Sequence, residues 1–84
     1  MIKIDDYIEG TEYYGHTTQR IKGWVDKIRE TNEGLEVDIQ CDDYYDGHRG
    51  NTIYEKLGSI IVLESQERPR LFLSRHLVLK LKGE

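Results

Sequence analysis

The sequence predicts a mostly β fold: a small barrel of four to five short antiparallel strands with at most one or two helical turns. Two observations lead to this prediction. Apolar residues occupy every second position over residues 34–41 and again over residues 77–81, which is the period of a strand with one packed face. These segments are short and closely spaced, and a few short strands avoid exposed edges most readily by curling into a barrel.

Length and composition indicate one small domain over residues 1–84. A chain of 84 residues buries only about 60–65% of its unfolded surface, so its core is thin. No apolar run approaches the roughly 20 residues that span a bilayer, and acidic residues follow the first methionine closely, so we expect neither a membrane partner nor a signal peptide. Because Cys41 is the only cysteine, no disulfide can form within the chain, and we expect a cytoplasmic protein.

The charge is unevenly distributed. The net charge is −4, but residues 1–65 carry −7 and residues 66–84 carry +3. An acidic chain is not typical of a dedicated duplex-binding protein. The basic end can still form one local site for an anion on an otherwise acidic body. The alternative is that the two regions pair with each other in the fold.

Residues 1–19 are expected to form an irregular N-terminal arm. Ile2, Ile4 and Ile8 are apolar, but acidic residues and Gly10 interrupt them. We expect one short strand or helical turn near residues 2–8 and then a long loop. The tyrosines of this loop either cover the end of the barrel or contact a partner.

Residues 20–41 predict a β-hairpin. The first strand, residues 20–29, changes parity midway, which indicates either two partly covered faces or a bulge near Asp26-Lys27. Gly23 suits a sharp bend or the close approach of another backbone. Gly34 serves the turn, since glycine adopts positive φ without a steric cost. The inward residues of the second strand are Leu35, Val37, Ile39 and Cys41.

The second half of the chain divides into short segments. Residues 42–51 lack a packing period and predict an exposed loop, where function tends to collect. Thr52 and Glu55 fit a capping box before one or two helical turns, although the same residues also suit a strand. Residues 59–63 form a continuous, largely β-branched apolar run, which predicts a central strand covered on both faces.

The C-terminal segment is expected to end the barrel. A turn over residues 64–69 includes Pro69, which bars that point from central strand pairing. A short strand is expected over residues 71–73, an interruption over residues 74–76, and a last strand over residues 77–81.

Two stretches are similar to known barrels. Residues 22–28, a turn and residues 35–39 resemble the KOW-type hairpin of ribosomal proteins and transcription elongation factors. Residues 71–79 resemble the close of a Src-homology-3-like barrel, where a strand meets a one-turn helix, here residues 74–76, and then a last short strand. The first resemblance implies RNA or the transcription machinery as partners, and the second implies a proline-rich segment on an aromatic groove. The chain departs from the KOW pattern in its acidic second strand and the acidic loop after it.

The candidate binding residues are aromatic, acidic or basic. Tyrosine and tryptophan give a large contact area at small entropy cost, and guanidinium groups grip planar anions. The candidates are Trp24, Asp42, Asp43, Tyr44, Tyr45, Asp46, Arg68, Arg70 and Arg75. The alternative role for the aromatic residues is to plug the ends of the barrel, and the alternative for the arginines is a scattered surface position.

No catalytic or metal site is expected, and no cofactor. Asp42, Asp43, Asp46 and His48 form the one cluster that suits a hard cation, but two ligands of the calcium-loop pattern are missing. The histidines have no zinc spacing with Cys41, which has the parity of a core thiol. The sequence also lacks a glycine-rich phosphate loop, so we expect that the protein is not an enzyme.

Three functions remain open. The leading hypothesis is a non-catalytic binding module for another protein, with a regulatory or adaptor role. The second is a nucleic-acid-associated barrel that binds RNA or single-stranded DNA through Trp24 and the arginines. The third is an acidic decoy that imitates the charge of nucleic acid and so occupies a nucleic-acid-binding protein. The sequence leaves the oligomeric state open.

Overall fold

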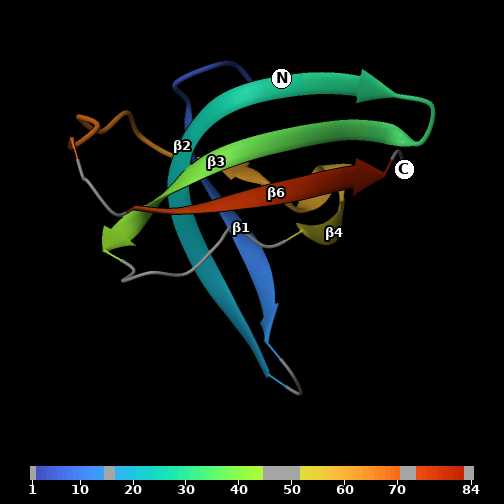
Figure 1. Cartoon of the computed structure of the whole chain (residues 1–84), viewed down its shortest axis with the longest axis horizontal. Coiled ribbons are helices and arrows are strands. Elements are labelled where there is room, and N and C mark those ends of the chain that lie inside the picture. Colours follow the sequence, from blue (N-terminus) through green and yellow to red (C-terminus); the bar gives the residue numbers. More distant parts are fainter. Residues whose placement is uncertain (1, 15–16, 45–51, 71–73, 83–84) are drawn as a thin grey trace.

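The computed structural model describes residues 2–14, 17–44, 52–70 and 74–82. In this part of the chain, six strands form one mixed sheet in the order β4-β6-β3-β2-β1-β5, and β4 lies parallel to β6 while the other neighbours are antiparallel (Figure 1). The mostly β prediction is confirmed. The sheet is open, however, and its six strands include a parallel pair, so it differs from the predicted antiparallel barrel. The elements are β1 (Tyr7–Tyr14), β2 (Thr17–Thr31), β3 (Gly34–Tyr44), β4 (Thr52–Lys56), the 3-10 turn η1 (Leu57–Ser59), β5 (Ile61–Val62) and β6 (Ser74–Lys82).

Strand β2 is long and belongs to two parts of the sheet. It pairs with β1 over residues 17–24 and with β3 over residues 23–31, and Figure 1 shows it bending between the two. At Gly23 a Cβ atom would collide with the backbone carbonyl of Gln40, which confirms the predicted close approach. The register shifts between Val25 and Lys27, which confirms the predicted bulge.

The core covers one face of β2, β3 and β6. The alternation predicted for β3 is correct, and Cys41 is buried as a core thiol. The turn before β3 has Gly34 at φ 137°, as expected for glycine. Strand β6 alternates buried and less buried residues along its length. The buried cluster consists of Ile8, Ile21, Val25, Val37, Ile39, Cys41, Leu77, Leu79 and Leu81.

Three local predictions are wrong. Residues 7–14 form a regular strand rather than part of an irregular arm, because they pair with β2 throughout. Residues 59–63 do not form a central strand, since only Ile61–Val62 pairs as a strand and it lies at the sheet edge with both residues exposed. Residues 74–76 do not form a helical turn but begin β6.

Residues 52–58 contain both of the structures that the sequence left open, a strand and a helical turn. A strand comes first and the 3-10 turn η1 follows it. β3 extends to Tyr44, so residues 42–44 belong to a strand and not to the loop predicted over residues 42–51. The remainder of that loop and the strand predicted over residues 71–73 lie outside the described residues.

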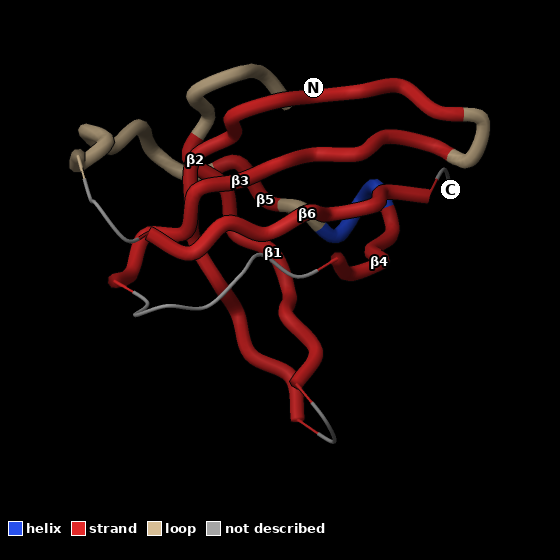
Figure 2. The backbone as a smooth tube through the Cα atoms, viewed as in Figure 1, coloured by secondary structure: helices blue, strands red, loops and turns tan. Residues whose placement is uncertain are grey.

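The two edges of the sheet approach each other. Strands β4 and β5 stand at opposite ends of the strand order, yet η1 and Ile60 suffice to join them (Figure 2). The sheet must therefore curl. Glu55 of β4 is buried, and its Oε1 accepts a hydrogen bond of 2.8 Å from the backbone N–H of Thr11 in β1. The Glu55 side chain thus links β4 to β1, which are not joined by strand pairing.

Candidate functional site

An aromatic pair lies on the outer face of the sheet, the face opposite the buried cluster. Tyr7, Trp24 and Gln40 are register neighbours on β1, β2 and β3. The rings of Tyr7 and Trp24 have centroids 5.0 Å apart and planes tilted by 39°. Both side chains are buried, and the Trp24 side chain is only 2% exposed. Something other than the core must therefore cover them.

That cover is supplied by residues 63–70, here called the crossing segment. The Trp24 Nε1–H donates to the carbonyl of Gln66 at 3.1 Å, and the Gln40 amide nitrogen donates to the carbonyl of Pro69 at 3.4 Å. At its start, the Leu63 N–H donates to the carbonyl of Tyr7 at 2.8 Å. The segment therefore lies across the aromatic pair and is held mainly through its backbone.

Arg68 anchors the crossing segment by charge. Its Nη1 lies 2.7 Å from Asp26 and 3.7 Å from Asp5, and its Nη2 donates to the carbonyl of Val25 at 3.3 Å. The Nδ1 of His76 lies 3.5 Å from the other oxygen of Asp26. A guanidinium with several acceptors is directional as well as charged, so Arg68 fixes where the segment crosses.

Asp42 joins the same cluster through Tyr7. The Tyr7 hydroxyl donates to the Asp42 carboxylate at 2.5 Å. Burial, followed by the hydrogen bond to Asp42 and the negative charge of Asp42, raises the pKa of Tyr7 to about 12. The phenol is therefore held in its neutral, donating form, which suits a structural role for Asp42.

Arg75 lies elsewhere, on the core side of β6. It is buried and lines a cavity of about 280 Å³ together with Asp42 and residues 19–22 of β2. Arg70 is exposed on the crossing segment. The structure thus brings Trp24, Asp42 and Arg68 together, whereas Arg75 is near only one of these three, Asp42, with which it lines the cavity. The side chains of Asp43 and Tyr44, and all of Tyr45 and Asp46, lie outside what the structure describes.

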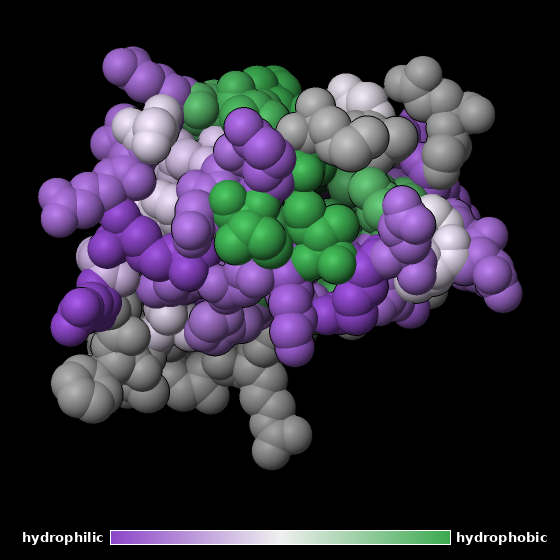
Figure 3. Space-filling view, turned by 90° about the horizontal axis from the view of Figure 1, so that it is seen from above, coloured by the Kyte–Doolittle hydropathy of each residue, from purple (hydrophilic) through white to green (hydrophobic). Residues whose placement is uncertain are grey.

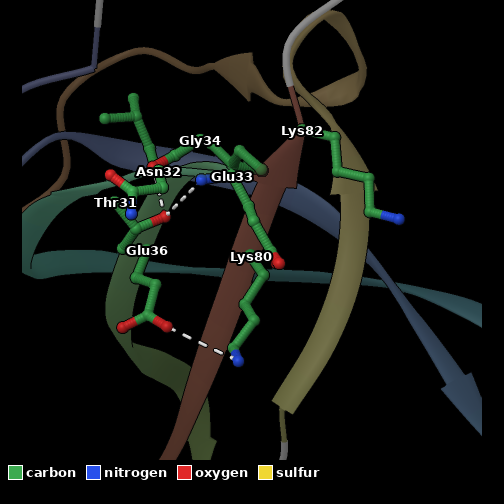
Figure 4. A pocket seen from close by; sticks show the side chains of 9 residues that line it. Thr31, Asn32, Glu33, Gly34, Glu36, Lys80 and Lys82 are labelled. Carbon is green, nitrogen blue, oxygen red and sulfur yellow. Dashed lines mark hydrogen bonds and ion pairs between the residues drawn. The ribbon is translucent and has the colours of Figure 1, made fainter.

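The charged residues of the outer face pair across the strands. Arg29 of β2 binds Asp38 of β3 at 2.7 and 3.0 Å and Glu36 at 3.2 Å. This guanidinium lowers the pKa of Asp38. Lys80 of β6 lies 3.5 Å from Glu36, beside a 260 Å³ pocket at the hairpin tip (Figure 4). For Arg68 and Lys80, the alternative that the basic end pairs with the acidic body is therefore correct.

Apolar side chains reach the surface at the β5 edge. Ile61 and Val62 are 48% and 50% exposed, and Ile4 in front of β1 is 52% exposed. Val62 pairs with the buried Ile8, so its side chain lies on the core side of the sheet. It is not part of the buried cluster, which ends at Ile8 on this side. Figure 3 shows hydrophobic residues at the surface among hydrophilic ones on the face seen from above. The open margin therefore leaves aliphatic area uncovered.

Among the residues of this arrangement that sequence reasoning missed are Tyr7, Gln40 and Glu55. For Tyr7 a signal existed, since outward Tyr7 and Glu9 alternate with inward Ile8 and Gly10 as in a strand. Gln40 has the outward parity of β3 and is buried by the crossing segment, which no local pattern indicates. Glu55 was interpreted as a helix cap, and its partner Thr11 is 44 residues away.

The described residues contain no group of three potential metal ligands, and no helix among them is long and apolar enough to cross a membrane. Neither a family model, a curated protein nor a solved structure matches this chain.

Proposed function

We propose that the chain is a non-catalytic binding module for another protein, with a regulatory or adaptor role, and that an extended segment of the partner adds beside β5. The observation that carries this proposal is the position of the most continuous aliphatic run of the chain. Residues 60–63 lie at the edge of the sheet, and the two residues of β5 are about half exposed. A run of this composition is normally buried, and a partner strand beside β5 would pair with the edge backbone and bury part of the exposed aliphatic area.

The backbone geometry of β5 supports strand addition. The Leu63 N–H points to β1, where it bonds to the carbonyl of Tyr7. Because hydrogen-bonding directions alternate along a strand, the N–H and C=O of Val62 point away from β1. These groups can pair with an incoming strand, while Ile61 and Val62 offer it one aliphatic contact on each face.

We also propose that the fold is related to the Src-homology-3-like and KOW-like barrels. The curled sheet and the bridge from Glu55 to Thr11 support this proposal. A strand, a 3-10 turn and a short strand do follow one another, but over β4, η1 and β5 rather than over residues 71–79.

The other two functions have weaker support from the described residues. Trp24 is covered by the crossing segment, so base stacking would require that segment to move. Arg68 is paired with Asp26. Of the acids that motivate a decoy, Glu36 and Asp38 are paired with Arg29, which reduces the free negative charge.

Site-specific photo-crosslinking tests the protein-binding proposal. A crosslinking residue in place of Ile61 should give a discrete adduct with another protein in an extract of the cells that make the chain. The matched control is the exposed β2 position Glu30, which should give no such adduct, and adding Val62→Lys should abolish the adduct at position 61. Equal labelling at both positions, no adduct, or an adduct with a second copy of this chain alone would contradict the proposal.

A further inference from the structure

The crossing segment is held mostly by contacts that do not depend on its sequence. Trp24 and Gln40 donate to two of its backbone carbonyls, and Tyr7 accepts from its first N–H. Residues 64–67 of the segment expose their side chains to solvent. Any extended backbone presents carbonyl groups, so this part of the outer face recognises an extended chain rather than one particular sequence.

One side chain contact is selective. Arg68 enters between Asp5 and Asp26, with distances of 3.7 and 2.7 Å, and also donates to the carbonyl of Val25. Two carboxylates and a carbonyl make a cationic subsite with directional acceptors, which a forked guanidinium fits. The outer face therefore selects an arginine in the register that Arg68 occupies, between the carbonyls of Gln66 and Pro69.

The segment is also weakly held compared with the strands. It has no strand pairing over residues 63–70, and its ion pair is partly exposed, with the Arg68 side chain at 30%. Partly exposed pairs add little stability, and elements with few buried contacts open locally before the whole fold does. A competing segment that repeats the same hydrogen bonds would replace those that are lost.

We propose that the outer face formed by Tyr7, Trp24, Gln40, Asp5 and Asp26 is a second binding site, for an extended arginine-containing segment of a partner protein. Residues 63–70, the crossing segment, occupy this site in the free chain and compete with the partner. The charge of the site favours this occupant, because Asp5 and Asp26 attract a guanidinium and repel a nucleic-acid phosphate. The site is formed by residues other than Ile61 and Val62 of β5, so binding here does not require a partner strand at the β5 edge.

Fluorescence of Trp24, the only tryptophan, tests the inference. The probe is a synthetic peptide with the sequence of residues 63–70, added to the full chain. Arg68→Ala in the chain should shift Trp24 emission to the red and should tighten peptide binding by roughly three- to tenfold, because the internal competitor loses its charged anchor. The control Arg70→Ala alters an exposed arginine two residues away and should change neither.

The peptide itself provides the second control, since a peptide carrying Arg68→Ala should not bind. The inference is overturned if neither chain binds the peptide, or if single-stranded RNA rather than the peptide binds the Arg68→Ala chain. Loss of the native circular dichroism spectrum in that variant would also overturn it, because the segment would then be needed for the chain to fold. If the chain binds no peptide but the crosslinking residue at position 61 still gives its adduct, only this inference fails, and the proposed protein-binding function stands.

Discussion

The centre of the sheet and its β5 margin contain the same kinds of aliphatic residue, but these residues are buried to different extents. Val37 and Ile39 on β3 are fully buried, whereas Ile61 and Val62 on β5 are about half exposed. β3 has a neighbour on each side, and β5 pairs with β1 over two residues only. In this thin, open sheet, position in the strand order decides whether an apolar residue is buried. Stability should therefore come from the centre, and the proposed strand addition would use the margin.

The largest expected effect is at the centre. Leu79→Ala should lower the free energy of unfolding by about 3 kcal/mol, because it removes a fully buried side chain and leaves a cavity. The matched substitution at the margin, Val62→Ala, should cost only a few tenths of a kcal/mol, roughly the value for surface changes. Urea unfolding of both variants measures the difference. Similar losses would show that the margin is as well packed as the centre.

The next effect concerns Tyr7 at alkaline pH. Its folded-state pKa is raised from 10.0 to about 12, mainly by burial and then by Asp42. The folded chain thus holds this proton more tightly than the unfolded chain does. The resulting stability is complete below pH 10 and should be lost between about pH 10 and 12, by roughly 2 kcal/mol.

The Tyr7→Phe variant isolates this contribution, since the other tyrosines titrate in both chains. The wild-type chain should lose more stability than the variant over that pH range, as followed by urea unfolding at each pH. If the free energy of unfolding falls equally with pH in both chains, Tyr7 ionises freely in the folded chain and the crossing segment does not bury it.

A smaller effect is expected where the edges approach each other. Glu55→Ala should cost about 1–2 kcal/mol, because the Thr11 N–H loses its acceptor at a partly buried position. Amide exchange at Thr11 should become faster, while Glu64→Ala, an exposed acid on the crossing segment, should change neither property. Unchanged exchange at Thr11 would indicate that the two edges hold together without this bridge.

The smallest effect belongs to the outer-face ion pairs. Arg29 lowers the pKa of Asp38 through their hydrogen bonds. The stability from this pair is therefore present above the unfolded-state pKa of an aspartate and is lost as the pH falls below it. Asp38→Asn should reduce this acid-side loss slightly, and added salt should weaken the pair in the wild-type chain. A melting temperature equally sensitive to acid in both chains would exclude the contribution.

Local patterns in the sequence predicted the centre well. The alternation of β3 and the leucines of β6 follows directly from one packed face, and Gly34 marks the turn. The change of parity within β2 correctly indicated the bulge. Each of these features is decided by residues a few positions apart.

The margin was not predictable in the same way. The aliphatic composition of residues 59–63 predicts burial. Whether these residues are buried depends on the position of β5 in the strand order, which a local sequence pattern does not indicate. Arg75 and His76 are polar and suggest a break, yet they continue the alternation of β6 because the buried Arg75 faces the core side. The crossing segment buries Trp24 through contacts between residues 42 positions apart.

Backbone hydrogen exchange of the unmodified chain, followed by NMR, compares the two regions most directly. The amides of Val37 and Ile39 should exchange only when the whole chain unfolds, whereas those of Ile61 and Leu63 should exchange on the order of a hundred times faster through local opening. Equal protection in the two strands would contradict the account, because the β5 margin and the crossing segment would then open only with the core.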